Sequence, residues 1–393
     1  MKILFICQYY YPEQFKINDI SSELVEQGHE VMVLTGLPNY PSGVIKKEYK
    51  GIKKRVEIIN GVKVIRSWLM GRGQGNIRLA LNYLSFAFSA SIKSLFIEKD
   101  FDLIFVYQLS PVTMALPGIL LNKITRKPLI LYCFDLWPES IVSGGISTES
   151  SLYKLLLRMS KWIYQKADMI ITSSKQFEEY FKSTLNIDKK INYLPIYAES
   201  IFNNIGNYND NNANFVFAGN IGEMQSLETI VYAAYELKDE KNIKIHVVGD
   251  GSSRKNCEEL SKSLHLDNII FYGHRPISEM PKFYELADAF LITLKSNRFI
   301  SYTLPGKVQT YMAAGKPIIG AIDGETRTII EEANCGQCAS AEDYRDLANK
   351  MRSFAKNKNK YLFYGQNARK YYENNFSKEI YMEKLNEFLQ KSI

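Results

Sequence analysis

The stretch that decides the fold runs YTLPGKVQTYMAAGKPII over residues 302–319. It predicts a loop, then a short helix with Pro305 and Gly306 at its start, then a buried strand introduced by Gly-Lys-Pro. A helix start directs free backbone N–H groups and the positive end of the helix dipole outward, which favours a phosphate or diphosphate. The sequence therefore predicts an anion site deep in the second half of the chain.

Apolar runs on both sides of this stretch alternate with segments of helical period, which is typical of parallel sheets with crossover helices. The first half predicts strands at 3–7, 31–35, 63–67, 103–107, 129–133, 169–172 and 191–194. The second half predicts strands at 215–218, 244–248, 268–272, 289–294 and 317–321. We expect two doubly wound α/β domains, residues 1–200 and 201–372, with the polar stretch 203–214 as a linker. A helix over 373–393 is expected to pack back on the first domain.

The length, hydrophobic content and net charge of the chain limit the classes of ligand that it can be expected to bind. The chain has 393 residues, of which 46% are hydrophobic, and carries 49 Lys plus Arg against 42 Asp plus Glu. A net charge of +7 is too small for a dedicated nucleic-acid binder and favours anionic substrates or an acidic membrane surface.

Basic residues crowd the segment 46–55: Lys46, Lys47, Lys50, Lys53, Lys54 and Arg55. Arg72 and Arg78 precede an amphipathic stretch at 79–96, which polar residues interrupt too often for a membrane span. We expect a cytoplasmic protein that is peripheral on the membrane. A solvated basic face is the alternative interpretation.

Five scattered cysteines predict reduced thiols in the core and no disulfide framework. Cys335 and Cys338 have the spacing of a metal site, but no second Cys or His pair accompanies them. We expect them to be packing residues at a helix-to-strand junction, and we expect no bound metal.

Four loops that follow strands in the second half would converge at one edge of its sheet: 219–222, 249–252, 273–276 and 302–307. Their glycines permit a ligand to approach the backbone, and Arg275 and Lys307 offer charge to phosphate oxygens. Each loop alone is more typical of a simple turn, because a glycine after a strand usually marks one. Together they favour a site for a phosphorylated ligand.

In the first half, Asp135 directly follows the strand 129–133. A carboxylate at that point can act on a reacting hydroxyl or stabilise positive charge on a sugar ring, although an Asp that caps the next helix is the rival interpretation. The segments 8–19 and 37–43 combine aromatic faces with amide and charged groups. That composition suits sugars and anions, or else ordered turns.

Taken together, these motifs make the chain resemble the retaining glycosyltransferases of family four, in the WbuB-like branch that builds bacterial surface polysaccharides such as O-antigen and capsule. The matching motifs are QYYYPE at 8–13 with FKIND at 15–19, GLPNYP at 36–41, DLWPES at 135–140, AGNIG at 218–222 and PGKVQTYMAAGKP at 305–317. The resemblance runs over the whole chain. It implies the GT-B fold, in which two Rossmann-like domains face a central cleft.

The resemblance also implies a reaction: transfer from a nucleotide sugar, with retained configuration and without a metal, to a polyprenyl-diphosphate-linked saccharide. UDP is the expected nucleotide, and an N-acetylated hexosamine or 6-deoxyhexosamine such as N-acetylfucosamine the expected sugar. The implied catalytic residues are Asp135, Lys307 and Arg275. The implied donor contacts are Gly219, Asn220, Gly222, Gly249, Arg275, Pro276, Tyr302, Leu304, Gly306, Lys307 and Glu325. The implied acceptor contacts are Gln8, Glu13, Lys16, Asn18, Asn39 and Tyr40.

The chain departs from the family pattern at the donor site. Tyr302 and Thr310 stand where many members carry two glutamates, and Asn220 and Gln225 stand where they carry an Arg and a Lys. Lys307 and Glu325 are expected to supply part of the missing charge. The loss of the glutamate pair leaves one alternative, a glycosyltransferase-like subunit that supports a partner enzyme without catalysis. A second alternative is a nucleotide-sugar 2-epimerase, which shares the same architecture.

Overall fold

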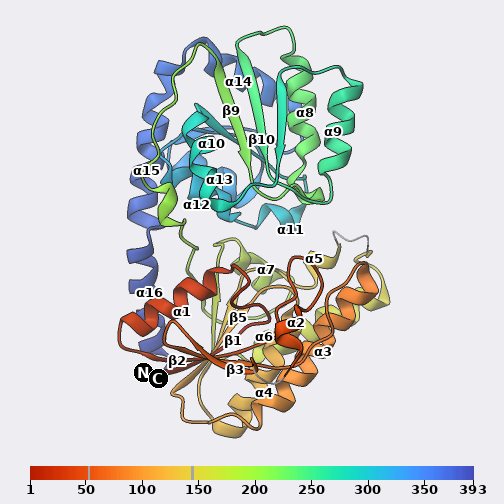
Figure 1. Cartoon of the computed structure of the whole chain (residues 1–393), viewed down its shortest axis with the longest axis vertical. Helices are drawn as coiled ribbons and strands as arrows, with labels where there is room; N and C mark the ends of the chain where they lie inside the picture. Colours follow the sequence, from red (N-terminus) through yellow and green to blue (C-terminus); the bar gives the residue numbers. More distant parts are fainter. Residues whose placement is uncertain (52–53, 143–145) are drawn as a thin grey trace. The chain divides into compact units, whose positions relative to one another are not determined.

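The structure is a computed structural model that describes residues 1–51, 54–142 and 146–393. Its contacts divide the chain into two compact units (Figure 1). Unit 1 contains residues 1–173, 177–194 and 382–393, and unit 2 contains residues 174–176 and 195–381. The polar stretch 203–214 therefore lies inside unit 2, and the chain passes between the units at Leu194 and Pro195.

Unit 1 is built on one eight-stranded sheet in the order β3-β4-β2-β1-β5-β6-β7-β8. Its strands are β1 (Lys2–Ile6), β2 (Glu30–Thr35), β3 (Val56–Ile59), β4 (Val62–Arg66), β5 (Leu103–Gln108), β6 (Leu129–Cys133), β7 (Met169–Thr172) and β8 (Ile191–Tyr193). All neighbouring strands are parallel except β3, which pairs antiparallel with β4 at the edge. Strands such as β5 and β6 are buried on both faces, because helices cover both sides of a parallel sheet.

The helices of unit 1 follow the strands in turn. They are α1 (Lys16–Glu26), α2 (Lys47–Lys50), α3 (Asn76–Ser94), η1 (Val112–Ala115), α4 (Leu116–Thr125), α5 (Glu139–Val142), α6 (Ser151–Lys166) and α7 (Phe177–Ser183). Within this unit, α4 packs against both α3 and α6. Right-handed crossovers place α1 on the opposite side of the sheet from these three helices, as Figure 1 shows.

Unit 2 has a six-stranded, fully parallel sheet in the order β11-β10-β9-β12-β13-β14. Its strands are β9 (Ala213–Ala218), β10 (Ile243–Val248), β11 (Ile269–Gly273), β12 (Ala289–Thr293), β13 (Ile318–Ala321) and β14 (Gly336–Ala339). Its first helices are η2 (Ser200–Phe202), η3 (Glu223–Gln225), α8 (Leu227–Glu236), α9 (Arg254–Ser263), η4 (Ile277–Glu279) and α10 (Met280–Leu286). The later ones are α11 (Arg298–Ser301), α12 (Gly306–Ala313), α13 (Gly324–Glu332), α14 (Tyr344–Lys356), η5 (Lys358–Tyr361) and α15 (Leu362–Asn375).

The last helix, α16 (Lys378–Lys391), begins in unit 2, and its residues from Met382 onward belong to unit 1. Within unit 1, Leu385 and Leu389 are buried, and Asn386 donates a hydrogen bond to Gln27 just after α1. Among the described residues, no helix is both long enough and apolar enough to cross a bilayer.

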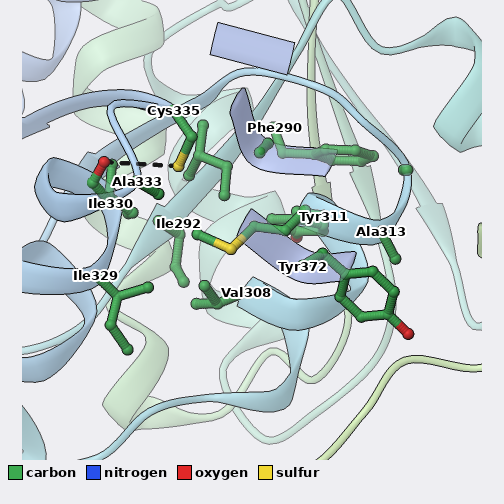
Figure 2. Close-up of a cluster of buried hydrophobic side chains, with 14 of the residues drawn as sticks. Phe290, Ile292, Val308, Tyr311, Ala313, Ile329, Ile330, Ala333, Cys335 and Tyr372 are labelled. Carbon is green, nitrogen blue, oxygen red and sulfur yellow. Dashed lines mark hydrogen bonds between the residues drawn. The ribbon is translucent and has the colours of Figure 1, made fainter. Parts of the chain in front are cut away.

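Each face of the unit 2 sheet has its own core cluster. The cluster around α12 contains Phe290, Val308 and Tyr311, and Figure 2 shows these side chains packed between the sheet and the helices. The thiol of Cys335 lies in the same cluster and contacts the carbonyl of Ile330 at the end of α13. Cys335 and Cys338 are buried free thiols at the junction of α13 and β14, which confirms that they are packing residues.

Candidate functional site

The candidate anion site in unit 2 lies where the strand order changes direction, between β9 and β12. Ligands of open parallel sheets bind outside the carboxyl ends of the strands at such a point. The loops after β9 and β10 pack backbone to backbone here, since the N–H of Ile221 donates to the carbonyl of Asp250. Gly249 has φ +149°, and a Cβ added there would lie 1.8 Å from the carbonyl oxygen of Gly219. Only glycine allows this approach.

Helix α12 is fixed at this point by Tyr311. The Tyr311 hydroxyl donates to the carbonyl of Ala218 at 3.0 Å and accepts from its N–H at 2.9 Å. The Tyr311 ring also stacks on Phe290 of β12, with centroids 4.0 Å apart and planes inclined by 3° (Figure 2). These contacts fix the second turn of α12 against the end of β9.

Lys307, in the first turn of α12, is the most unusual charged residue of unit 2. Its ammonium nitrogen is buried, has no hydrogen-bond partner and lies 3.9 Å from the centre of the Phe217 ring. A Cβ added to Gly219 would lie 3.6 Å from the same nitrogen. Burial lowers the pKa of Lys307 to about 7. An unpaired buried ammonium is costly, so the site is suited to an anion that would pair with it.

The turn after β9 is shaped by Gln225. Its side-chain oxygen accepts from the N–H of Gly222 at 3.0 Å and from the amide of Asn220 at 3.2 Å. These two hydrogen bonds stabilise the turn. They also hold the Asn220 side chain next to Gly222. The N–H of Gly219 already donates to Val248, so it takes part in the sheet.

Arg275 and Pro276 lie on the exposed loop after β11. The Arg275 guanidinium donates to the carbonyl of Tyr272 at 3.2 Å and lies 3.9 Å from the carboxylate of Glu279. Both contacts are with residues of the strand before this loop or of the short helix that follows it. That Arg275 shares a ligand with Lys307 stays a prediction.

Two further residues that were predicted as donor contacts are buried. The Leu304 side chain lies in the core cluster around α12. Glu325 is buried at the start of α13, where its two carboxylate oxygens accept from the N–H groups of Lys175 and Gln176 at 3.1 and 3.2 Å. Burial raises the pKa of Glu325. Its carboxylate anchors the segment 174–176 of unit 2.

Tyr302 and Gly306 border the start of α12. The Tyr302 hydroxyl accepts from the guanidinium of Arg298 at 3.0 Å, and its carbonyl accepts from the Ser174 hydroxyl. Gly306 is exposed, as a backbone contact at a helix start requires. Thr310, one turn later, donates from its hydroxyl to the carbonyl of Gly306 at 2.9 Å.

In unit 1, the predicted residues follow β1, β2 and β6, whose carboxyl ends lie at one edge of the sheet. Asp135 is half-buried just after β6. Burial raises the pKa of Asp135, and hydrogen bonds with the side chain and backbone of Ser110 oppose that shift. The backbone carbonyl of Asp135 accepts from Gln108 of β5, the neighbouring strand, at 3.1 Å.

Glu13 organises the loop after β2. One buried carboxylate oxygen of Glu13 accepts from the N–H of Asn39 at 2.7 Å and from the N–H of Tyr40 at 2.5 Å. Burial raises the pKa of Glu13 to about 7, against the lowering effect of these hydrogen bonds. Glu13 was predicted to contact an acceptor, whereas both of these contacts are internal. The Asn18 amide donates to the Glu13 carbonyl at 2.7 Å and holds the same segment.

Gln8 and Asn39 are also buried, and Asn82 of α3 joins them. The Gln8 amide donates to the Asn82 side-chain oxygen at 2.7 Å, and the Asn82 amide donates to that of Asn39 at 3.2 Å. The Asn39 oxygen also accepts from the N–H of Arg72 at 3.1 Å. The loops after β1 and β2 are thereby fastened to α3. Sequence analysis missed Asn82, because α3 also contains several serines and nothing in the local sequence sets Asn82 apart.

Aromatic rings form the outer part of this group. Tyr40 is exposed and packs against Tyr9 and Phe15, with centroids 5.8 and 5.5 Å away. The Arg72 guanidinium lies 5.5 Å from the Tyr40 ring centre. Lys16, the first residue of α1, is half-buried beside Phe15 in the sequence. Of the predicted acceptor residues, Tyr40 and Lys16 therefore offer more surface to a ligand than the buried Gln8, Glu13 and Asn39.

Two protein-family models match this chain. Residues 17–195 match Glycosyltransferase Family 4, and residues 200–371 match Glycosyl transferases group 1. Together they account for nearly all of both units. The two matches lie between residues 17 and 371, and each covers less than half of the chain.

Similar proteins agree with these matches. WbjE of Pseudomonas aeruginosa, named as a glycosyltransferase, is 25% identical over 282 residues, which cover 68% of each chain. WcaI of Escherichia coli, named as a colanic acid biosynthesis glycosyl transferase, is 25% identical over 80% of this chain and 82% of its own.

Solved structures establish the fold. A sucrose-phosphate synthase from Thermosynechococcus elongatus has a TM-score of 0.79 and 16% identity, with 99% of this chain and 98% of that chain covered. HepE of Anabaena in complex with UDP has a TM-score of 0.74 and 16% identity, with both chains fully covered. These likenesses confirm the predicted fold class of two Rossmann-like α/β domains, the GT-B fold.

Proposed function

Because both halves of this GT-B chain match glycosyltransferase families, we propose that it is a retaining glycosyltransferase that uses a UDP-sugar donor. The observation that carries the proposal is the buried, unpaired ammonium of Lys307 at the start of α12. A diphosphate at this point would pair with Lys307 and meet the free N–H groups of the helix start. UDP is favoured as the nucleotide because HepE, of similar fold, has a solved complex with it.

In the proposed reaction, the bond from the sugar to the diphosphate breaks as an acceptor hydroxyl attacks from the same face, so the configuration is retained. Lys307 stabilises the negative charge that develops on the departing diphosphate, and a phosphate oxygen accepts the proton of the attacking hydroxyl. Removal of one such donor typically costs about 10²–10³ in rate. No metal is needed in this proposal.

We further propose that the acceptor is a saccharide on polyprenyl diphosphate, in the synthesis of a surface polysaccharide such as O-antigen or capsule. WcaI and WbjE support this class. The acceptor would lie at the carboxyl edge of the unit 1 sheet, with Tyr40 as a stacking surface and Asp135 near the reacting group. The proposed sugar is an N-acetylhexosamine or its 6-deoxy form, as in the WbuB-like branch.

The test is Lys307→Ala, assayed for transfer from a panel of UDP-sugars and for thermal stabilisation by UDP. We expect loss of transfer by at least about 10² and loss of stabilisation, with an unchanged fold. The matched control is Lys316→Ala, because the Lys316 ammonium is also largely buried in unit 2 but donates to Asn207 at 2.7 Å. Near-normal transfer by Lys307→Ala would overturn the proposal.

The same assay separates the two alternatives. A supporting subunit without catalysis would bind UDP yet neither transfer nor slowly hydrolyse any UDP-sugar. A 2-epimerase would invert C2 of the donor sugar with no acceptor present. The loss of the family's glutamate pair, at Tyr302 and Thr310, is the feature that favours the first alternative.

A further inference from the structure

Helix α3 has an apolar outer face. Six residues that recur every three or four positions, and so share one side of the helix, are between 41% and 79% exposed: Ile77, Leu81, Leu84, Phe88, Ile92 and Leu95. We call these six residues the α3 stripe. Over 18 residues of helix the stripe extends for about 27 Å. The opposite side of α3 is buried against unit 1 and includes Asn82, Phe86 and Ala90.

An exposed helix face normally carries charged and polar residues, whereas a contiguous apolar patch marks an interaction surface. Between Glu57 and Glu98 the sequence contains no acidic residue. Arg78 and Lys93 stand near the two ends of the stripe. A second, shorter set of exposed apolar residues lies on α6 at helical spacing, namely Leu152, Leu155 and Trp162.

The distribution of charge between the two units indicates the chemistry of the partner. Unit 1 has 26 Lys plus Arg against 19 Asp plus Glu, and unit 2 has 23 of each, so unit 1 carries the whole net charge of +7. The segment that precedes α2 lies beside the start of α3, because the N–H of Gly73 donates to the carbonyl of Gly43 at 2.9 Å. Exposed Lys46, Lys47 and Lys50 follow directly. Lys53 of the predicted basic segment lies outside the described residues.

We propose that the α3 stripe docks on the surface of an anionic lipid bilayer, with its apolar side chains in the headgroup region and the flanking basic residues on lipid phosphates. A second copy of the chain is a poorer occupant, since two units of charge +7 would repel each other. The inference is independent of donor binding, although it agrees with the proposed lipid-linked acceptor.

The inner side of α3 links this surface to the proposed acceptor site. Asn82 is fully buried and bonds to Gln8 and Asn39, in the loops after β1 and β2. The Asn82 amide also donates to the carbonyl of Met70 at 2.6 Å, at the approach to the helix. A bilayer that holds α3 would therefore hold the loops on which the acceptor is expected to lie.

The test uses the full chain and sedimentation with two kinds of vesicle: phosphatidylcholine alone, and the same lipid with about one third phosphatidylglycerol. We expect at least about tenfold stronger binding to the anionic vesicles, and a loss of at least about tenfold in Leu84→Ser/Phe88→Ser. Leu84 is 59% exposed and Phe88 is 71% exposed. The matched control is Leu362→Ser/Phe363→Ser on α15 of unit 2, in residues 63% and 42% exposed, which should bind as the wild type does.

UDP stabilisation, measured on the same samples, reports on the donor site separately and should be unchanged in both variants. Should the double variant fail to fold, Phe88→Ser alone gives the readout. The proposal is overturned if the wild type does not bind anionic vesicles, or if Leu84→Ser/Phe88→Ser binds them as well as the control does. A concentration-dependent dimer that the stripe substitutions abolish would also overturn it, in favour of a second copy.

Discussion

At the scale of single residues, the pKa of Lys307 sets a pH dependence. Its value of about 7 in the folded chain is below the ordinary lysine value of 10.5, so above pH 7 the unfolded chain binds more protons. The free energy of unfolding should therefore rise with pH between about 7 and 9, by up to about 1.4 kcal/mol per pH unit, relative to Lys307→Met. Urea denaturation of both proteins across this range measures the difference. Equal slopes would contradict the assignment.

The same residue makes the binding of UDP depend on pH in the opposite sense. A diphosphate beside Lys307 favours its charged form, so binding above pH 7 requires proton uptake. We expect the affinity for UDP to fall as the pH rises from about 7, and calorimetry in buffers of different ionisation enthalpy would detect the proton taken up. In Lys307→Met, no such uptake should remain.

Sequence could locate some site residues and not others. Lys307 and Gly219 were predicted because a helix start and a post-strand glycine leave a signal in the local sequence. The anchoring role of Glu325 was missed because its partners, Lys175 and Gln176, lie about 150 positions away. Asn82 was missed for the same reason, since Gln8 and Asn39 are brought to it only by the order of the strands.

At the scale of elements, Tyr311 sets the position of α12. Tyr311→Phe keeps the ring that stacks on Phe290 but removes the hydroxyl that pairs with both backbone groups of Ala218. Leaving these buried groups unpaired should lower the free energy of unfolding by about 1–3 kcal/mol. Because the second turn of α12 then loses its hydrogen bonds to β9, the helix is held less firmly and UDP should also bind more weakly. Urea denaturation and calorimetry measure the two effects.

A matched control for this variant is Tyr284→Phe, which removes the hydroxyl of another buried tyrosine in the same cluster. It should leave the affinity for UDP unchanged, because Tyr284 lies on α10 and has no contact with Ala218 among the described hydrogen bonds. If both variants weaken UDP binding equally, the effect comes from general loosening of the core and Tyr311 has no special role.

Element prediction succeeded at apolar runs and failed at one edge of each sheet. All twelve predicted strands are present. Most of them are short apolar runs between turn residues, as strands buried on both faces of a parallel sheet are. Strands β3 and β14, each at one edge of its sheet, were missed. Strand β3 shows why. Its residues alternate between exposed and half-buried, and it joins β4 through a turn at Asn60 and Gly61, both with positive φ. That Asn-Gly pair is the hairpin signal that should have revealed it.

At the scale of the whole molecule, the two units differ in charge and in expected ligand. Unit 1 carries all of the net positive charge and the α3 stripe, whereas unit 2 is neutral overall and carries the buried ammonium of Lys307. The total charge of +7 does not reveal that the excess positive charge lies in unit 1. The difference appears only when the charged residues are assigned to the two units. A net charge of zero on unit 2 is compatible with the proposed binding of an anion, because one desolvated charge interacts more strongly with a bound anion than several exposed charges do.

The difference between the two units predicts which backbone amides UDP protects from hydrogen exchange. Ligand binding slows hydrogen exchange in the elements that the ligand holds, because their opening must now release it. In the full chain, UDP should slow exchange of the amides at 219–222 and 303–308 in unit 2 and leave those of β1, β5 and β6 in unit 1 unchanged. Lys307→Ala should lose this protection and Lys316→Ala should keep it. Protection that is confined to unit 1 would place the nucleotide there and remove the basis for a donor site at Lys307.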